Sequence, residues 1–99
     1  MKQFVSEFVG TFVFMLVILY ATAQNAQWPN LAPLLIVGGL LSGIVLSATN
    51  SGGHLNPAVS FMMYLKGALT LNGMGEYMVA QLLGAFVAVM VKSHIDKMM

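Results

Sequence analysis

The sequence SGGHLNPAVS, at residues 51–60, places a glycine pair and a helix start directly after a long apolar segment. Its first half is too rich in glycine to continue a regular helix. Asn56 is a strong helix N-cap, and Pro57 suits the first helical position. The sequence therefore predicts a short helix that begins after Asn56 and ends near Gly67. A helix of this length rises about 13 Å, which is less than half of a bilayer core.

Three apolar segments surround this short helix, at residues 4–22, 31–49 and 77–91. The first two have close to the roughly 20 residues that cross a hydrocarbon core, whereas the third needs the polar residues at its ends to reach both interfaces. The polar turn between the first two contains Trp28, a residue typical of membrane interfaces. A short apolar helix behind a glycine-rich loop is typical of a re-entrant segment, whose backbone is tolerated only where protein or water satisfies it.

The composition excludes most other classes of protein. Of the 99 residues, 59% are hydrophobic and 7% are charged, against roughly 25% charged in a soluble domain. The net charge of +1 gives no basic field for nucleic acid. The chain has no cysteine and only two histidines, too few for a metal cage, and it lacks a base–nucleophile set or a phosphate loop. We expect an integral, multi-pass membrane protein of one domain, with no metal, cofactor or enzymatic activity.

The start of the chain leaves one alternative open. Lys2, the apolar run that follows and the small residues at 21–23 resemble a signal peptide with its cleavage site. Glu7 argues against this interpretation, because a carboxylate is unfavourable within the apolar part of a signal peptide.

Three motifs give the sequence a family resemblance. The loop at residues 51–60 resembles the first signature loop of the aquaporins and glycerol facilitators, the major intrinsic protein family. EFVGTF at residues 7–12 resembles the start of that family's first helix, and AQLLGA at residues 80–85 resembles the middle of its third. The motifs occur in the family's order and spacing. The resemblance implies an all-α membrane protein with three transmembrane helices plus one re-entrant half-helix, an aquaporin-like half domain over residues 1–99.

The resemblance extends only to the amino-terminal half of the family. A usual member has two inverted halves, each with an Asn-Pro-Ala loop, whereas this chain has one such motif and no internal repeat. In the family's second loop an arginine follows Asn-Pro-Ala; here Val59 follows it, and the chain has no arginine. Ile36 stands where the family usually has an aromatic residue that narrows the pore. We expect a wider, more apolar constriction, with a lipid- or core-facing Ile36 as the alternative.

The loop also has a chemistry that follows from its residues. A helix N-terminus carries about half a positive charge and unpaired N–H groups. If the Asn56 carboxamide oxygen accepts a hydrogen bond from one of these N–H groups, the Asn56 NH2 group remains free to donate to a neutral solute. The positive end of the helix dipole repels cations. An ordinary capped helix on a surface loop is the alternative. The resemblance implies a pore lined by Asn56 and by Gly52, Gly53, His54, Pro57, Ala58, Val59 and Ile36.

Other side chains are predicted to support this loop. By resemblance, Glu7 accepts hydrogen bonds from the loop backbone, and a simple interfacial carboxylate is the alternative. Gln81 is expected to find a polar partner, either in the loop or on a neighbouring helix. The His54 side chain is expected to brace the loop, while its carbonyl faces the pore.

Small residues in the second apolar segment predict a close helix crossing. Gly39 and Gly43 form a G-x-x-x-G pair, which permits two helix backbones to approach each other, and the adjacent Gly38 is expected at the same crossing.

The lysines indicate how a half-length chain could form a two-sided pore. Lys2 and Lys66 are expected on one side of the membrane and Lys92 and Lys97 on the other, so the positive-inside rule gives no orientation. This balance is what a dual-topology protein needs, and two antiparallel copies would recreate the family's inverted repeat. We expect a passive channel for water, with small neutral solutes such as glycerol as further candidates, formed by antiparallel pairs and, by analogy with the family's tetramers, by a tetramer of pairs.

Three alternatives to this function stay open. The chain could pair with a separately encoded second half that supplies the missing arginine. It could be a fragment without transport activity. It could also be a small membrane protein of another class, one that forms holes or modulates a partner.

Overall fold

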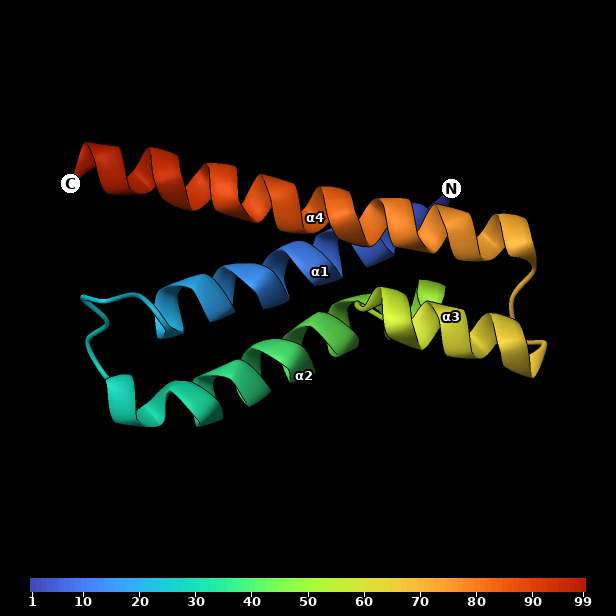
Figure 1. Cartoon of the computed structure of the whole chain (residues 1–99), viewed down its shortest axis with the longest axis horizontal. Helices are drawn as coiled ribbons and strands as arrows, with labels where there is room; N and C mark the ends of the chain where they lie inside the picture. The colour runs from blue at the N-terminus through green and yellow to red at the C-terminus, as the bar shows by residue number, and fades with distance from the viewer.

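The computed structural model describes all 99 residues, and its regular elements are all helices (Figure 1). This confirms the all-α prediction. In chain order the elements are α1 (Lys2–Ala21), the short 3-10 helix η1 (Pro29–Leu31), α2 (Ala32–Ser51), α3 (Pro57–Lys66) and α4 (Leu71–Met98).

The three long helices correspond to the three apolar segments, but α4 is longer than predicted. It begins six residues before the apolar segment 77–91 and ends seven residues after it. Thr70 caps its start, because the Thr70 hydroxyl oxygen accepts a hydrogen bond from Gly73 N (3.0 Å). Near its end, Lys92 and Asp96 form an ion pair one turn apart, a spacing that supports the helix. Caps and polar pairs thus extend α4 beyond its apolar part.

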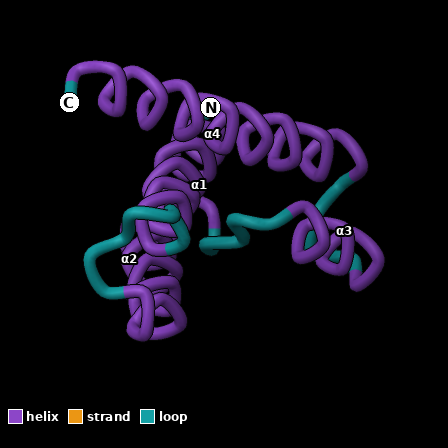
Figure 2. Tube along the Cα trace, turned by 60° about the vertical axis from the view of Figure 1, so that its left-hand side comes forward, coloured by secondary structure: helices purple, strands orange, loops and turns teal.

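α1 lies between α2 and α4 (Figure 1) and packs against both of them. α1 and α2 run in opposite directions, α4 runs in the same direction as α1, and the two chain ends lie at opposite ends of the molecule. α3 packs against α4 and lies beside the three long helices rather than among them (Figure 2).

Glycines allow α1 to approach both of its neighbours closely. A Cβ atom added to Gly43 on α2 would lie 2.7 Å from the Gly10 carbonyl oxygen on α1, and one added to Gly39 would lie 2.7 Å from Val17. On the opposite side of α1, a Cβ atom added to Gly84 on α4 would lie 2.7 Å from the Phe8 carbonyl oxygen. Larger side chains at these positions would push the helices apart.

The prediction that Gly38 contributes to the helix crossing is wrong. A Cβ atom added there meets nothing within 4 Å, and Gly38 is exposed. Successive residues on a helix are about 100° apart, so Gly38 points away from the face that carries Gly39 and Gly43.

Polar side chains outnumber apolar ones among the buried residues, and the exposed large side chains are mainly apolar. Glu7, Thr11, Ser47, Ser60 and Gln81 are all within 1% of complete burial. Large hydrophobic side chains, by contrast, are exposed along all four α-helices. The segments 2–21, 29–51 and 71–98 are long and apolar enough to cross a membrane. This distribution fits an integral, multi-pass membrane protein, in which lipid rather than water surrounds the helices.

Candidate functional site

The carboxylate of Glu7 on α1 holds the loop between α2 and α3. Its Oε1 accepts hydrogen bonds from Leu55 N (2.7 Å) and Gln81 Nε2 (2.9 Å). Its Oε2 accepts hydrogen bonds from Ser51 Oγ (2.6 Å) and His54 N (3.0 Å). Glu7 is completely buried, so these four donors supply the polar partners that water would otherwise give a carboxylate. The structure thus joins α1, α4, the end of α2 and the loop through one side chain.

A second group of polar side chains continues this network into α3. Ser60 Oγ accepts a hydrogen bond from Gln81 Nε2 and lies 2.9 Å from His54 Nδ1. Tyr77 donates a hydrogen bond from its hydroxyl to the Ser51 carbonyl oxygen (2.8 Å), and its ring lies 4.6 Å from the His54 ring. Gln81 therefore contacts Glu7 and α3 rather than the loop backbone itself.

Leu55 places the end of the loop halfway along the long helices. Its side chain is completely buried, and its methyl groups would lie 2.7 Å from a Cβ atom added to Gly10 or Gly43. These two glycines lie near the middle of α1 and α2. Leu55 has a φ of +58°, a left-handed conformation that is strained for a bulky side chain and is held here by the surrounding contacts.

The loop turns back along α2 instead of continuing away from it. A Cβ atom added to Gly53 would lie 3.3 Å from Ile44 Cα, although Ile44 is seven residues, or about 10 Å of helix, before Ser51. α3 then runs toward the same end of the molecule as the end of α2 (Figure 1).

The start of α3 has the predicted cap. Asn56 Oδ1 accepts a hydrogen bond from Ala58 N (2.8 Å), and Gly67, with φ +92°, ends the helix. The predicted bounds of this helix are therefore confirmed. The Asn56 NH2 group makes no hydrogen bond within the chain, and Asn56 is exposed. The first turn of α3 contains no acidic residue of its own, and the nearest carboxylate is that of Glu7, which binds the loop at His54 N and Leu55 N.

Several carbonyl groups of the loop also lack partners within the chain. The backbone oxygens of Gly52, Gly53 and His54 accept no hydrogen bond from backbone or side chain. Together with the Asn56 NH2 group they offer three acceptors and a donor to a small polar molecule.

The remaining predicted pore residues are less closely grouped. Ala58 is exposed, and Pro57 and Val59 are half-buried, all in the first turn of α3. Ile36 is half-buried near the start of α2. It lies eight residues before Ile44, the residue beside Gly53, and so about 12 Å from the loop along α2.

Six further residues that build the site were not predicted individually. Gly10 and Gly84 lie inside the two helix motifs, and their small size was the available signal. Ser60 lies one turn after Asn56, on the face of α3 that packs inward. Ser51, Tyr77 and Leu55 gave no local signal, because their roles depend on residues far away in the sequence.

Comparisons with known proteins agree with this architecture. The family described as Major intrinsic protein matches residues 1–98. The chain is 36% identical over 97 residues to a probable aquaporin, TIP2-2, of Oryza sativa subsp. japonica. It is 37% identical over 97 residues to aquaporin TIP2-1 of Zea mays. Both alignments cover 88% of this chain and 39% of the relative. It is also 37% identical over 94 residues to aquaglyceroporin-2 of Rhizophagus irregularis, over 88% of this chain and 29% of that protein.

The chain thus spans about two fifths or less of the length of these relatives. No solved structure gives a significant match. The family match covers nearly every residue and includes the loop, the Asn56 cap and the buried Glu7. The chain belongs to the major intrinsic protein family.

Proposed function

We propose that α3 is a re-entrant half-helix and that the loop before it lines a passive channel for water and small neutral solutes. The observation that carries this proposal is the position of Leu55 beside Gly10 and Gly43, halfway along two helices that are long enough to span a membrane. Asn56 follows directly, so α3 begins at the level of the bilayer midplane. Backbone without regular pairing is tolerated at this depth only where it lines a water-filled path or is covered by protein.

The polar groups of the loop support a path for neutral molecules. The Asn56 NH2 group donates, and the carbonyl oxygens of Gly52, Gly53 and His54 accept, so a water molecule can exchange partners as it moves. The positive end of the α3 dipole disfavours cations at the same point. Ile36 and Val59 leave room for solutes larger than water, and glycerol is the first candidate. Ile36, Pro57, Ala58 and Val59 form the apolar part of the proposed lining.

The second half of the channel is supplied, in this proposal, by an inverted copy of the same chain. One α3 reaches from the midplane to one end of the molecule only, so a two-sided path needs a second half-helix from the opposite side. The apolar side chains of Phe61, Met62 and Leu65 on α3 are exposed in the single chain and are available to pack against such a copy. Two lysines near each end leave the orientation undecided, as dual topology requires. Four such pairs would correspond to the family's tetramer.

Replacing Asn56 with aspartate should lower the water permeability of proteoliposomes about tenfold. The carboxylate loses the NH2 donor and adds an anion at membrane depth, which is costly for the path of a neutral solute. Stopped-flow shrinkage measures the permeability for water first and then for glycerol. Asn72→Asp, at an exposed position in the first turn of α4, makes the same chemical change away from the loop. Equal permeability of the two variants would contradict the proposed lining.

A reporter fused to the carboxyl terminus should be found on both sides of the membrane, in similar amounts. The expected distribution follows from the balance of lysines, and protease protection of the reporter measures it. Adding two lysines beside Lys97 should move most copies into one orientation and abolish transport. A reporter on one side only, with transport intact, would exclude antiparallel pairing. It would not contradict the proposal that the loop lines a channel. Co-purification of another Asn-Pro-Ala chain would then identify a separately encoded half.

A further inference from the structure

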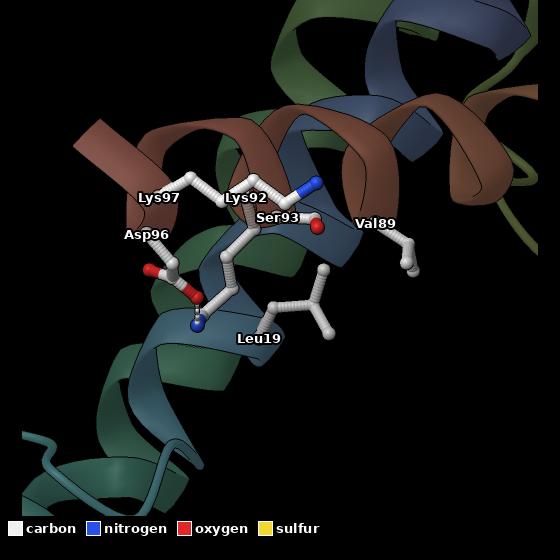
Figure 3. Close-up of a pocket in the computed structure, with 6 residues that line it drawn as sticks. All are labelled: Leu19, Val89, Lys92, Ser93, Asp96 and Lys97. Carbon is white, nitrogen blue, oxygen red and sulfur yellow. Dashed lines mark hydrogen bonds and ion pairs between the residues drawn. The ribbon is translucent and has the colours of Figure 1, made fainter. Parts of the chain in front are cut away.

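A hollow lies between the ends of α1 and α4, away from the loop and its hydrogen-bond network. It has a volume of about 400 Å³, and Figure 3 shows the side chains around it. Its lining combines an apolar part with cationic and hydroxyl groups. The lining residues are Leu19, Val89, Lys92, Ser93, Asp96 and Lys97.

The packing of α1 on α4 places this hollow at the edge of the hydrocarbon core. Gly84 contacts α1 near its middle, and Lys92 and Lys97 lie eight and thirteen residues further along α4. These separations correspond to rises of about 12 Å and about 20 Å. The half-thickness of a hydrocarbon core is about 15 Å. The hollow therefore extends from the acyl chains, beside Leu19 and Val89, into the headgroup region.

The charges around the hollow are not balanced. Lys92 Nζ is paired with Asp96 Oδ2 at 2.7 Å and lies 5.2 Å from the centre of the Tyr20 ring. Lys97 makes no ion pair. In Figure 3 the Lys97 side chain extends toward Ser93, whereas Lys92 extends toward Asp96. One ammonium group and one hydroxyl group are thus available to an anion, and the only carboxylate in the hollow is already paired.

We propose that this hollow binds the headgroup phosphate of an anionic phospholipid. The Lys97 ammonium and the Ser93 hydroxyl hold the phosphate, and the upper part of an acyl chain lies along Leu19 and Val89. A zwitterionic lipid binds less tightly, because the only carboxylate that could pair with its cationic group is that of Asp96, which is already paired with Lys92. The site requires insertion into a membrane but not channel activity. A test of lipid binding is therefore independent of the proposed pore.

Native mass spectrometry of the full chain tests this site. With equal amounts of phosphatidylglycerol and phosphatidylcholine of the same acyl chains, we expect about fivefold preferential retention of phosphatidylglycerol, the contribution of one lysine near a membrane surface. Lys97→Gln should remove this preference. Lys66→Gln, a matched change at the end of α3, should leave it intact.

Three further results would overturn the proposal. The first is equal retention of the two lipids by the unchanged chain, and the second is the same loss of preference in Lys66→Gln as in Lys97→Gln. The third concerns inorganic phosphate, which offers the anion without an acyl chain. If phosphate raised the thermal unfolding midpoint in detergent as much as phosphatidylglycerol does, the hollow would be a simple anion site. We expect phosphate to leave the midpoint unchanged.

Discussion

Glu7→Gln should lower the free energy of unfolding by about 2–5 kcal/mol and remove most of the water permeability. Each carboxylate oxygen of Glu7 accepts two hydrogen bonds. A glutamine replaces one of these oxygens with an NH2 group, which then faces donors and leaves a buried N–H group unpaired. An unsatisfied buried polar group costs about 1–3 kcal/mol, and more where the missing partner is charged. The loss of His54 N or Leu55 N as an anchored donor would also displace the adjacent Asn56 amide.

The measurements for this variant are the thermal unfolding midpoint in detergent and the shrinkage rate of proteoliposomes. Glu76→Gln is the matched control, because Glu76 is exposed and makes no hydrogen bond through its side chain. Both variants change the net charge equally. If they had the same midpoint and the same permeability, the buried carboxylate would not be what positions the loop.

Gly43→Ala should destabilise the protein by about 1–3 kcal/mol, the usual cost of overpacking a closely packed contact. The new methyl group would lie 2.7 Å from the Gly10 carbonyl oxygen and 2.7 Å from a methyl group of Leu55. The carbonyl belongs to the backbone of α1, so it can move only if the two helices separate. Because Leu55 carries the end of the loop, the substitution should also reduce water permeability. Unfolding in a graded denaturing detergent and stopped-flow shrinkage measure the two effects.

Gly38→Ala, on the same helix, is the matched control, because this substitution is not expected to destabilise the protein. A methyl group there meets nothing within 4 Å, and alanine is a better helix former than glycine. Its stability should equal or slightly exceed that of the unchanged chain. Equal destabilisation by the two alanines would mean that the effect arises from the helix itself and not from the crossing of α1 and α2.

The sequence predicted the features of the fold that are encoded locally. The apolar segments located the three long helices, and the order of Asn56, Pro57 and Gly67 located both ends of α3, because caps and left-handed glycines act within a few residues. The length of α4 was underestimated, because its polar ends are stabilised by capping and ion pairing, and the hydrophobicity of the sequence does not indicate these interactions.

The parts of the site that the sequence did not predict depend on contacts between distant residues. The left-handed conformation of Leu55 is held by two sets of contacts. Its side chain packs against Gly10 and Gly43, and its N–H group donates a hydrogen bond to Glu7. Gly38 and Gly39 cannot be told apart by residue type, and only the direction of the helix face separates them. The partners of Glu7 were expected from the family resemblance, whereas the distances and the link through Gln81 to Ser60 required the structure.

The buried carboxylate of Glu7 has a consequence for the biosynthesis of the chain. Its donors lie 44, 47, 48 and 74 residues further along the sequence. At about 5–20 residues per second, Gln81 is synthesised roughly 4–15 s after Glu7. During that interval the Glu7 carboxylate lacks its donor from α4, and an unpaired carboxylate among lipid chains is costly. The hydrogen-bond network around Glu7 is therefore complete only after the last helix has been synthesised.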